Sequence, residues 1–136
     1  VRVLLGSDAT PARVREAAQG ARYLLLATHG VAHESDRALR SGLALSAPEG
    51  GDADDAWLTL GHLLADWGGL LEGCDLAVLS ACETATGRVY RAEGIVGLTR
   101  AFTMAGAPRV LCSLWKVDDE ATGAPMKRAT VTRACS

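Results

Sequence analysis

The sequence predicts an α/β fold: a three-layer sandwich in which helices cover both faces of a mostly parallel sheet. Three short apolar runs, at 23–27, 76–79 and 109–114, are typical of strands buried on both faces. Segments with the helical spacing of apolar residues lie between these runs. The first strand, helix and strand together take up about 27 residues, which suits a βαβ unit with a right-handed crossover.

The first half of the chain begins with a predicted strand at 1–5, closed by Gly6. Thr10 is then expected to cap a helix that has Pro11 at its first position. The helix is predicted from apolar residues at helical spacing: Val14, Ala17, Ala18 and Ala21. The strand at 23–27 follows and stops at Thr28-His29-Gly30.

Residues 31–56 are less regular. Segments 42–46 and 57–58 are predicted to form a hairpin across the Gly- and Asp-rich stretch 48–55, which favours an exposed loop. Thr59 is expected to cap a second helix. Its apolar residues are Leu60, Leu63, Leu64 and Trp67.

The second half repeats the alternation of strand and helix. The strand at 76–79 ends at residues 80–84, and a helix is predicted near 93–105 with Gly106 as its C-cap. The strand at 109–114 ends at Trp115, before the acidic residues 118–120. We expect no second domain, because 136 residues are typical of one.

Composition excludes several classes of protein. Hydrophobic residues make up 49% of the chain, which excludes disorder as the main state. The net charge of −2, with no block of one sign, gives no support for a nucleic-acid or membrane-surface partner. No apolar run approaches the roughly 20 residues that span a bilayer, and the first residues show no signal-peptide pattern. The sequence therefore predicts a soluble, cytoplasmic protein.

A histidine and a cysteine follow two of the predicted parallel strands. In open α/β sheets, ligands bind beyond the carboxyl ends of the strands. His29 at one end and Cys82 at the next would give a thiol nucleophile with an imidazole that takes and returns its proton. The backbone N–H groups of Gly30 and Cys82 could bind the oxyanion of a tetrahedral intermediate. Cys82 follows His29 by 53 residues (82 − 29), close to the separation in caspases.

Four segments carry a resemblance to a known family. LLATHG (25–30), VLSACET (78–84), EGIVGLTRAF (93–102) and SLWKVDD (113–119) resemble, in this order, the CHAT domain. These caspase-like peptidases are usually found C-terminal to tetratricopeptide repeats. The resemblance implies a caspase-like fold, a catalytic dyad of His29 and Cys82, and no metal or organic cofactor. It also implies a protein or peptide substrate, and a tetratricopeptide-repeat region or regulatory partner in the full-length protein.

The segment SLWKVDD also looks like the corresponding stretch of separase, where an acidic residue helps to hold a basic side chain before the scissile bond. Carried over, Asp118 becomes a candidate wall of the substrate pocket, and we expect cleavage after Arg or Lys. The chain lacks the QACxG motif of the caspases, which prefer Asp at that place.

Two departures from the family pattern concern the ends of the chain. A CHAT domain normally has a further strand between those expected at 1–5 and 23–27, so the resemblance implies that the domain is incomplete at its start. Residues 123–136 lose the apolar periodicity of the next helix, since Gly123 and Pro125 break it. The prediction is a partial domain over 1–122 with an irregular tail over 123–136.

Simpler interpretations apply to the other candidate residues. Cys74 and Cys112 are expected to be core thiols, and Cys135 an exposed bystander. His29 and His33 have a spacing that can bind zinc on a helix, but here the pair follows a strand, so we expect His33 to be solvated. Acidic residues 118–120 could equally cap a helix. The remaining expectations are a surface His62 and packing roles for the tryptophans: Trp57, Trp67 and Trp115.

Three functions from different classes thus follow from the sequence. The first is a cysteine endopeptidase. The second is a truncated, catalytically silent domain that acts as a protein-interaction module. The third is a structural or regulatory metal domain, which predicts stoichiometric zinc in the purified protein.

Overall fold

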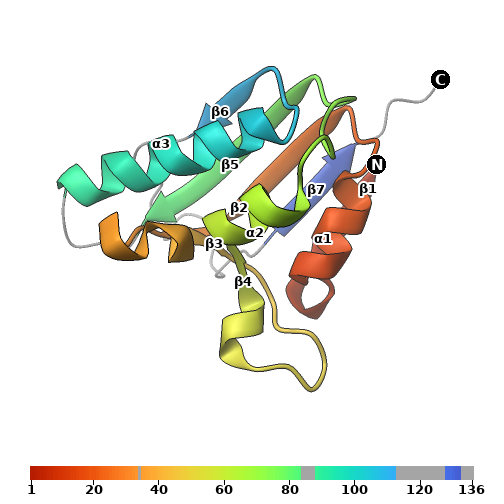
Figure 1. Cartoon of the computed structure of the whole chain (residues 1–136). Coiled ribbons are helices and arrows are strands. Elements are labelled where there is room, and N and C mark those ends of the chain that lie inside the picture. Colours follow the sequence, from red (N-terminus) through yellow and green to blue (C-terminus); the bar gives the residue numbers. More distant parts are fainter. Residues whose placement is uncertain (34, 84–87, 113–127, 133–136) are drawn as a thin grey trace, which may run out of the picture.

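The computed structural model describes residues 1–33, 35–83, 88–112 and 128–132 (Figure 1). One mixed sheet forms the centre of these ranges. Its strands are β1 (Arg2–Leu5), β2 (Tyr23–Val31), β3 (Gly42–Ala44), β4 (Trp57–Thr59), β5 (Leu76–Glu83), β6 (Val110–Cys112) and β7 (Arg128–Thr132). The helices are α1 (Pro11–Ala18), α2 (Leu60–Asp66) and α3 (Arg88–Met104), and short 3-10 turns lie at Gly6–Asp8, Ser35–Arg40 and Ala53–Ala56.

The sheet is parallel only in its middle. Strand β2 pairs in parallel with β5, and β5 with β6. The other ladders among the described strands, β1–β7, β7–β2, β2–β3 and β3–β4, are antiparallel. The predicted α/β class is confirmed. The expected mostly parallel sheet is instead a mixed one, because β3 and β7 pair in antiparallel direction with the edge of β2 that lies opposite β5.

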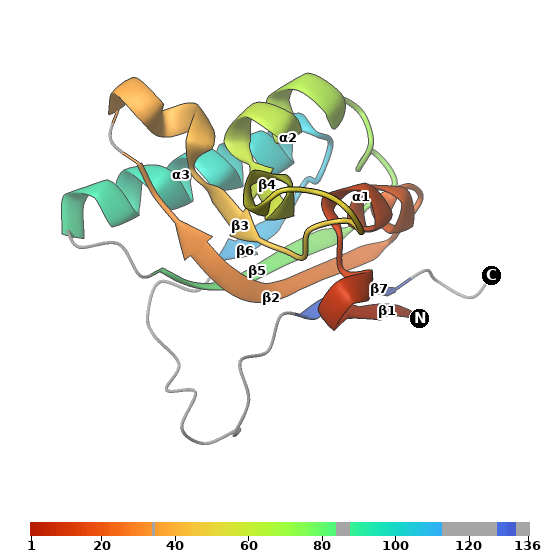
Figure 2. The ribbon, with the colours of Figure 1, turned by 90° about the horizontal axis from the view of Figure 1, so that it is seen from below.

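The three described helices lie on one face of the sheet (Figure 2). Burial alternates along β2 accordingly: Leu24, Leu26, Thr28 and Gly30 are buried, whereas Tyr23 on the other face is 46% exposed. The sequence predicted strands buried on both faces, yet β2 is fully buried on only one. No second helical layer is found among the described residues, so the three-layer arrangement stays a prediction.

Helix capping follows the sequence closely. The Thr10 side chain accepts a hydrogen bond from the Arg13 N–H at 3.3 Å, with Pro11 in the first turn. Thr59 and His62 form a reciprocal capping box at the start of α2. Gly106, after α3, has a φ of +113° and allows the chain to turn toward β6. All three predicted helices exist, although α3 begins at Arg88, five residues before the predicted start near 93 (93 − 88).

The hydrophobic core lies between the sheet and its helices. Trp67 at the end of α2 and Phe102 of α3 meet edge to face, with ring centroids 5.7 Å apart. Trp67 is 1% exposed and Phe102 is fully buried, so this pair joins the two helices over the sheet. Buried leucines of the strands complete the core below them: Leu24, Leu26, Leu43, Leu58 and Leu79.

The tail contains a strand that the sequence did not predict. Residues 128–132 form β7, which lies between β1 and β2 and is antiparallel to both. The expectation of an irregular tail over 123–136 is therefore wrong for these five residues. Three consecutive β-branched residues, Thr130, Val131 and Thr132, suit a strand, and the facing edges of β1 and β2 need backbone partners.

No helix in the described parts of the chain is long and apolar enough to cross a membrane.

Candidate active site

The parallel ladder between β2 and β5 brings the two predicted catalytic positions together. The ladder begins where Tyr23 faces Leu76 and continues in register to its end, where Gly30 faces Glu83. One step before this end, His29 and Cys82 are direct Cα partners. The apolar runs of the two strands pair side by side, so the residues that follow each run lie next to each other at the carboxyl edge.

His29 is half-buried, and its Nδ1 atom is inaccessible to water. This nitrogen makes no hydrogen bond to any residue that the structure describes. A buried nitrogen with no partner costs about 1–3 kcal/mol, so such an atom in a native protein calls for an explanation. A hydrogen-bond donor to Nδ1 that comes either from the neighbouring strand or from a bound substrate would explain it.

The residues on either side of His29 are held in place. The Thr28 hydroxyl, which is buried, donates a hydrogen bond to the Ala44 carbonyl of the next strand. Gly30 faces Leu43 of β3 on one side and Glu83 of β5 on the other. The backbone around His29 is thus paired with a strand on each side. The role of the Gly30 amide as an oxyanion donor stays a prediction.

Strand alternation places positions 29 and 82 on the same side of the sheet. On β2, His29 belongs to the less buried set with Tyr23 and Leu25. On β5, Val78 and Ser80 are half-buried while Leu79 is buried, so position 82 falls with Val78 and Ser80. Only the backbone of Cys82 is described.

Three further predictions concern residues outside the described part of the chain. Asp118, the candidate pocket wall, lies there, and its role in the substrate pocket stays a prediction. The same holds for Cys135 and Trp115.

The two other described cysteines differ in environment. Cys74 is buried, and this burial raises the pKa of its thiol. Cys112 is half-buried in the edge strand β6. A thiol with a raised pKa is protonated at neutral pH and reacts slowly, as expected of a core residue.

The remaining histidines make hydrogen bonds with neighbouring residues. His33 is exposed, as expected, and its backbone N–H donates to the Ser41 hydroxyl at 2.9 Å. His62 is exposed too, with its Nδ1 atom 3.2 Å from the Trp57 carbonyl. Within the described residues, no group of three or more His, Cys, Asp or Glu side chains could hold a metal ion.

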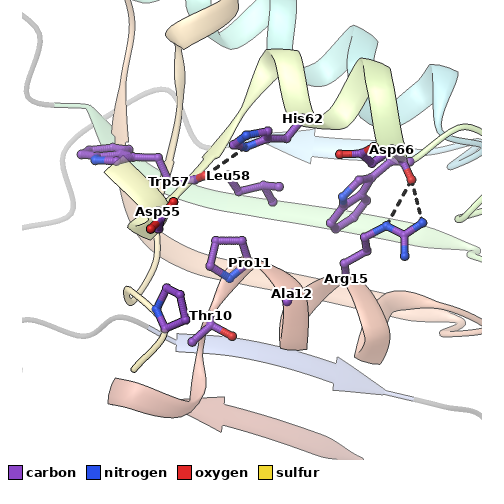
Figure 3. A pocket seen from close by; sticks show the side chains of 11 residues that line it. Thr10, Pro11, Ala12, Arg15, Asp55, Trp57, Leu58, His62 and Asp66 are labelled. Atoms are coloured by element: carbon purple, nitrogen blue, oxygen red, sulfur yellow. Dashed lines mark hydrogen bonds between the residues drawn. The ribbon is translucent and has the colours of Figure 1, made fainter. Parts of the chain in front are cut away.

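Two neighbouring cavities, neither of which His29 lines, were missed by sequence reasoning. The first, of about 480 Å³, runs between α1 and α2 and is walled by Pro11, Arg15 and Trp57 among others (Figure 3). The second, of about 600 Å³, reaches Val31 at the end of β2. Both include Asp55, Trp57 and His62. Trp57 was expected only to pack, and the acidic pair Asp54-Asp55, separated from it by one residue in the sequence, was the available signal.

Comparison with known proteins decides the family. The family model of the CHAT domain matches residues 1–132, nearly the whole chain. This chain belongs to the CHAT domain family. The match extends ten residues beyond the predicted boundary at 122 (132 − 122) and takes in β7.

One mouse protein resembles part of this CHAT domain. Tetratricopeptide repeat protein 28 of Mus musculus is 57% identical over 42 residues, which are 31% of this chain and 2% of that protein. The chain thus spans a small fraction of that relative's length. No solved structure matches this CHAT domain. The family itself is caspase-like and related to peptidases, which agrees with the resemblance in the sequence.

Proposed function

We propose that this CHAT domain is a cysteine endopeptidase with His29 and Cys82 as its catalytic dyad. The observation that carries the proposal is the register of β2 and β5, in which these two positions face each other near the carboxyl end of the ladder. The Nδ1 atom of His29 supports it, because no donor among the described residues occupies this nitrogen, which leaves it available for a hydrogen bond from a nucleophile or substrate. A nucleophile and its base on two rigid, paired strands keep their geometry better than they would on loops.

The chemistry proceeds in two steps. His29 takes the thiol proton of Cys82, and the resulting thiolate attacks the carbonyl carbon of the scissile peptide. The tetrahedral intermediate collapses when His29 returns that proton to the leaving amine, which leaves an acyl-enzyme. A water molecule, deprotonated by His29, then attacks the thioester and releases the carboxylic acid and the free thiol. Backbone amides of Gly30 and Cys82 are the proposed donors to the oxyanion in both steps.

The finer parts of the proposal come from the family resemblance. They are a substrate pocket with Asp118 in its wall, cleavage after Arg or Lys, and a second helical layer on the open face of the sheet. A tetratricopeptide-repeat region in the full-length protein and a cytoplasmic location belong with them. The match to a mouse tetratricopeptide-repeat protein supports the repeat association.

A second function is favoured by one observation. On the face of the sheet that no described helix covers, Leu111 is 60% exposed and Tyr23 is 46% exposed, and large exposed apolar side chains suit contact with another protein. A catalytically silent CHAT domain that acts as an interaction module would use such a surface and would need no reactive cysteine.

A peptidyl electrophile separates the two functions. The chain is exposed briefly to a probe with Arg before the reactive group, beside a matched probe with Asp, and labelled cysteines are mapped by mass spectrometry. The peptidase predicts that the Arg probe labels Cys82 selectively. Preference for the Asp probe would keep the peptidase and contradict the basic pocket. Slow, equal labelling of all four cysteines would contradict the peptidase and favour the interaction module.

A further inference from the structure

The two cavities meet at one aromatic side chain. Trp57 of the edge strand β4 is half-buried and lines both of them, together with Asp55 and His62. We call this surface the Trp57 groove; its residues are Val31, Asp54, Asp55, Trp57 and His62. Volumes of about 480 and 600 Å³ lie within the range of ligand-binding pockets, roughly 300–1,000 Å³.

The groove begins close to the proposed dyad. Val31 lines the second cavity and lies two residues after His29 on the same strand (31 − 29). An extended chain advances about 3.3 Å per residue. When a peptide is bound with its scissile bond at His29, a peptide side chain a few residues away can therefore reach this cavity.

The carboxylates of Asp54 and Asp55 are exposed, and a hydrogen bond restrains the one on Asp55. Asp55 is the last residue of a capping box: its Oδ2 atom accepts a hydrogen bond from the Asp52 N–H at 2.9 Å. This bond fixes the Asp55 side chain where it lines both cavities. Asp54 precedes it in the same turn and lines the second cavity. Two carboxylates thus line the same cavity as the Trp57 indole, and both favour a cation.

Each of the two cavities also contains one arginine, and the two arginines differ in their effect on a cationic ligand. The Arg15 guanidinium is held at the far end of the first cavity, where Nε and Nη2 donate to the Asp66 carbonyl at 3.1 and 2.9 Å (Figure 3). Arg40 lines the second cavity, the one that holds Asp54. Its positive charge repels a cation there. Removal of Arg40 should therefore strengthen the binding of a cationic ligand, whereas removal of the carboxylates should weaken it.

We propose that the Trp57 groove binds a basic side chain, arginine or lysine, of the peptide substrate. The cation lies on the Trp57 indole and is held by Asp54 and Asp55. This inference rests on the proposed function, because it takes the ligand to be the substrate of the dyad. It adds a recognition site remote from the scissile bond, which a peptide would occupy in addition to the pocket at the dyad.

The test measures binding without catalysis. The Cys82→Ala chain is titrated with three blocked peptides that differ only in a central Arg, Gln or Glu, and binding is followed by the indole N–H signal of Trp57 in NMR spectra. We expect the Arg peptide to bind about 10-fold more tightly than the Gln peptide, with the Glu peptide weakest. The double variant Asp54→Asn/Asp55→Asn, which keeps the capping acceptor, should reduce the preference several-fold and leave only the part that the Trp57 indole and the pocket at the dyad supply.

Two further variants sharpen the result. Arg40→Ala should tighten the Arg peptide several-fold, because it removes an opposing charge. Glu72→Gln removes an exposed charge outside both cavities and should change nothing. Equal affinity for the Arg and Gln peptides, tighter binding of the Glu peptide, or an Arg preference of unchanged size in the double Asp variant would each overturn the proposal. The labelling of Cys82 by an electrophile depends on the dyad and not on the Trp57 groove. A result against the groove can therefore be distinguished from a result against the peptidase.

Discussion

His29 and Cys82 face each other as direct partners across the parallel ladder of β2 and β5. The two residues are 53 positions apart in the chain (82 − 29), and the β3–β4 hairpin and helix α2 lie between them. A slip of one residue in this register would move one of the two positions to the helix-covered face of the sheet. The candidate dyad therefore depends on how the buried face of the sheet packs, and substitutions there should affect it.

Removal of the Thr28 hydroxyl should weaken the strand that carries His29. Thr28→Val keeps the shape but leaves the buried Ala44 carbonyl without this donor, and we expect a loss of about 1–3 kcal/mol in the free energy of unfolding. Urea denaturation measures the loss. Thr28→Ser retains a hydroxyl and serves as the control, and an equal loss in both variants would contradict the role of the hydrogen bond.

Truncation of Phe102 should be among the most damaging core changes. Phe102→Ala removes the edge-to-face partner of Trp67 and leaves a cavity between α2 and α3, which costs about 3–5 kcal/mol. Met104→Ala, on the exposed side of the same helix, should cost less than about 1 kcal/mol. Thermal unfolding of both variants checks the difference, and similar melting temperatures would show that the two helices do not pack through this pair.

Gly106→Ala should destabilise the turn between α3 and β6. A Cβ at this position would lie 2.7 Å from the Glu72 backbone nitrogen, and the φ of +113° is strained for any residue with a side chain. We expect a loss of about 2–4 kcal/mol from the collision and the strain together. Gly73→Ala provides the comparison, because a Cβ there meets no atom within 4 Å. Equal stability of the two variants would contradict the close approach of the two loops.

The buried thiol of Cys74 gives stability a pH dependence of known sign. Its pKa is raised by burial, so the unfolded chain loses the thiol proton first as the pH increases. The stabilising contribution is complete below the unfolded pKa of about 8.5 and is lost as the pH rises through the folded pKa. Urea unfolding between pH 7 and 10 should show a steeper decline for the parent chain than for Cys74→Ala. Parallel curves would contradict burial of this thiol.

Local signals predicted much of the fold. Thr10, Thr59 and Gly106 were identified as helix ends from residue type and position alone, because caps satisfy backbone groups within a few residues. The strand ends that carry His29 and Cys82 were also predicted, since each follows a continuous apolar run. The family resemblance rested on these same segments, and the family match confirms it.

Long-range features could not be read in the same way. The run at 23–27 is apolar throughout, yet only one face of β2 is covered by the described helices, and nothing in the run itself distinguishes the faces. Strand β7 is short and forms between edges set by residues far earlier in the chain. The Trp57 groove depends on the spacing of α1, β4 and α2, which periodicity does not encode. Tertiary packing decides each of these.

The most direct measurement is the reaction rate of each cysteine with iodoacetamide, a small electrophile that needs no substrate pocket. Rates are mapped by mass spectrometry at pH 7 in the parent chain and in His29→Ala. We expect Cys82 to react at least about 10-fold faster than Cys74 and Cys112, because a neighbouring imidazole raises the fraction of thiolate. His29→Ala should remove this advantage, whereas His33→Ala should preserve it. A Cys82 that reacts no faster than Cys112, or whose rate is unchanged in His29→Ala, would contradict the dyad.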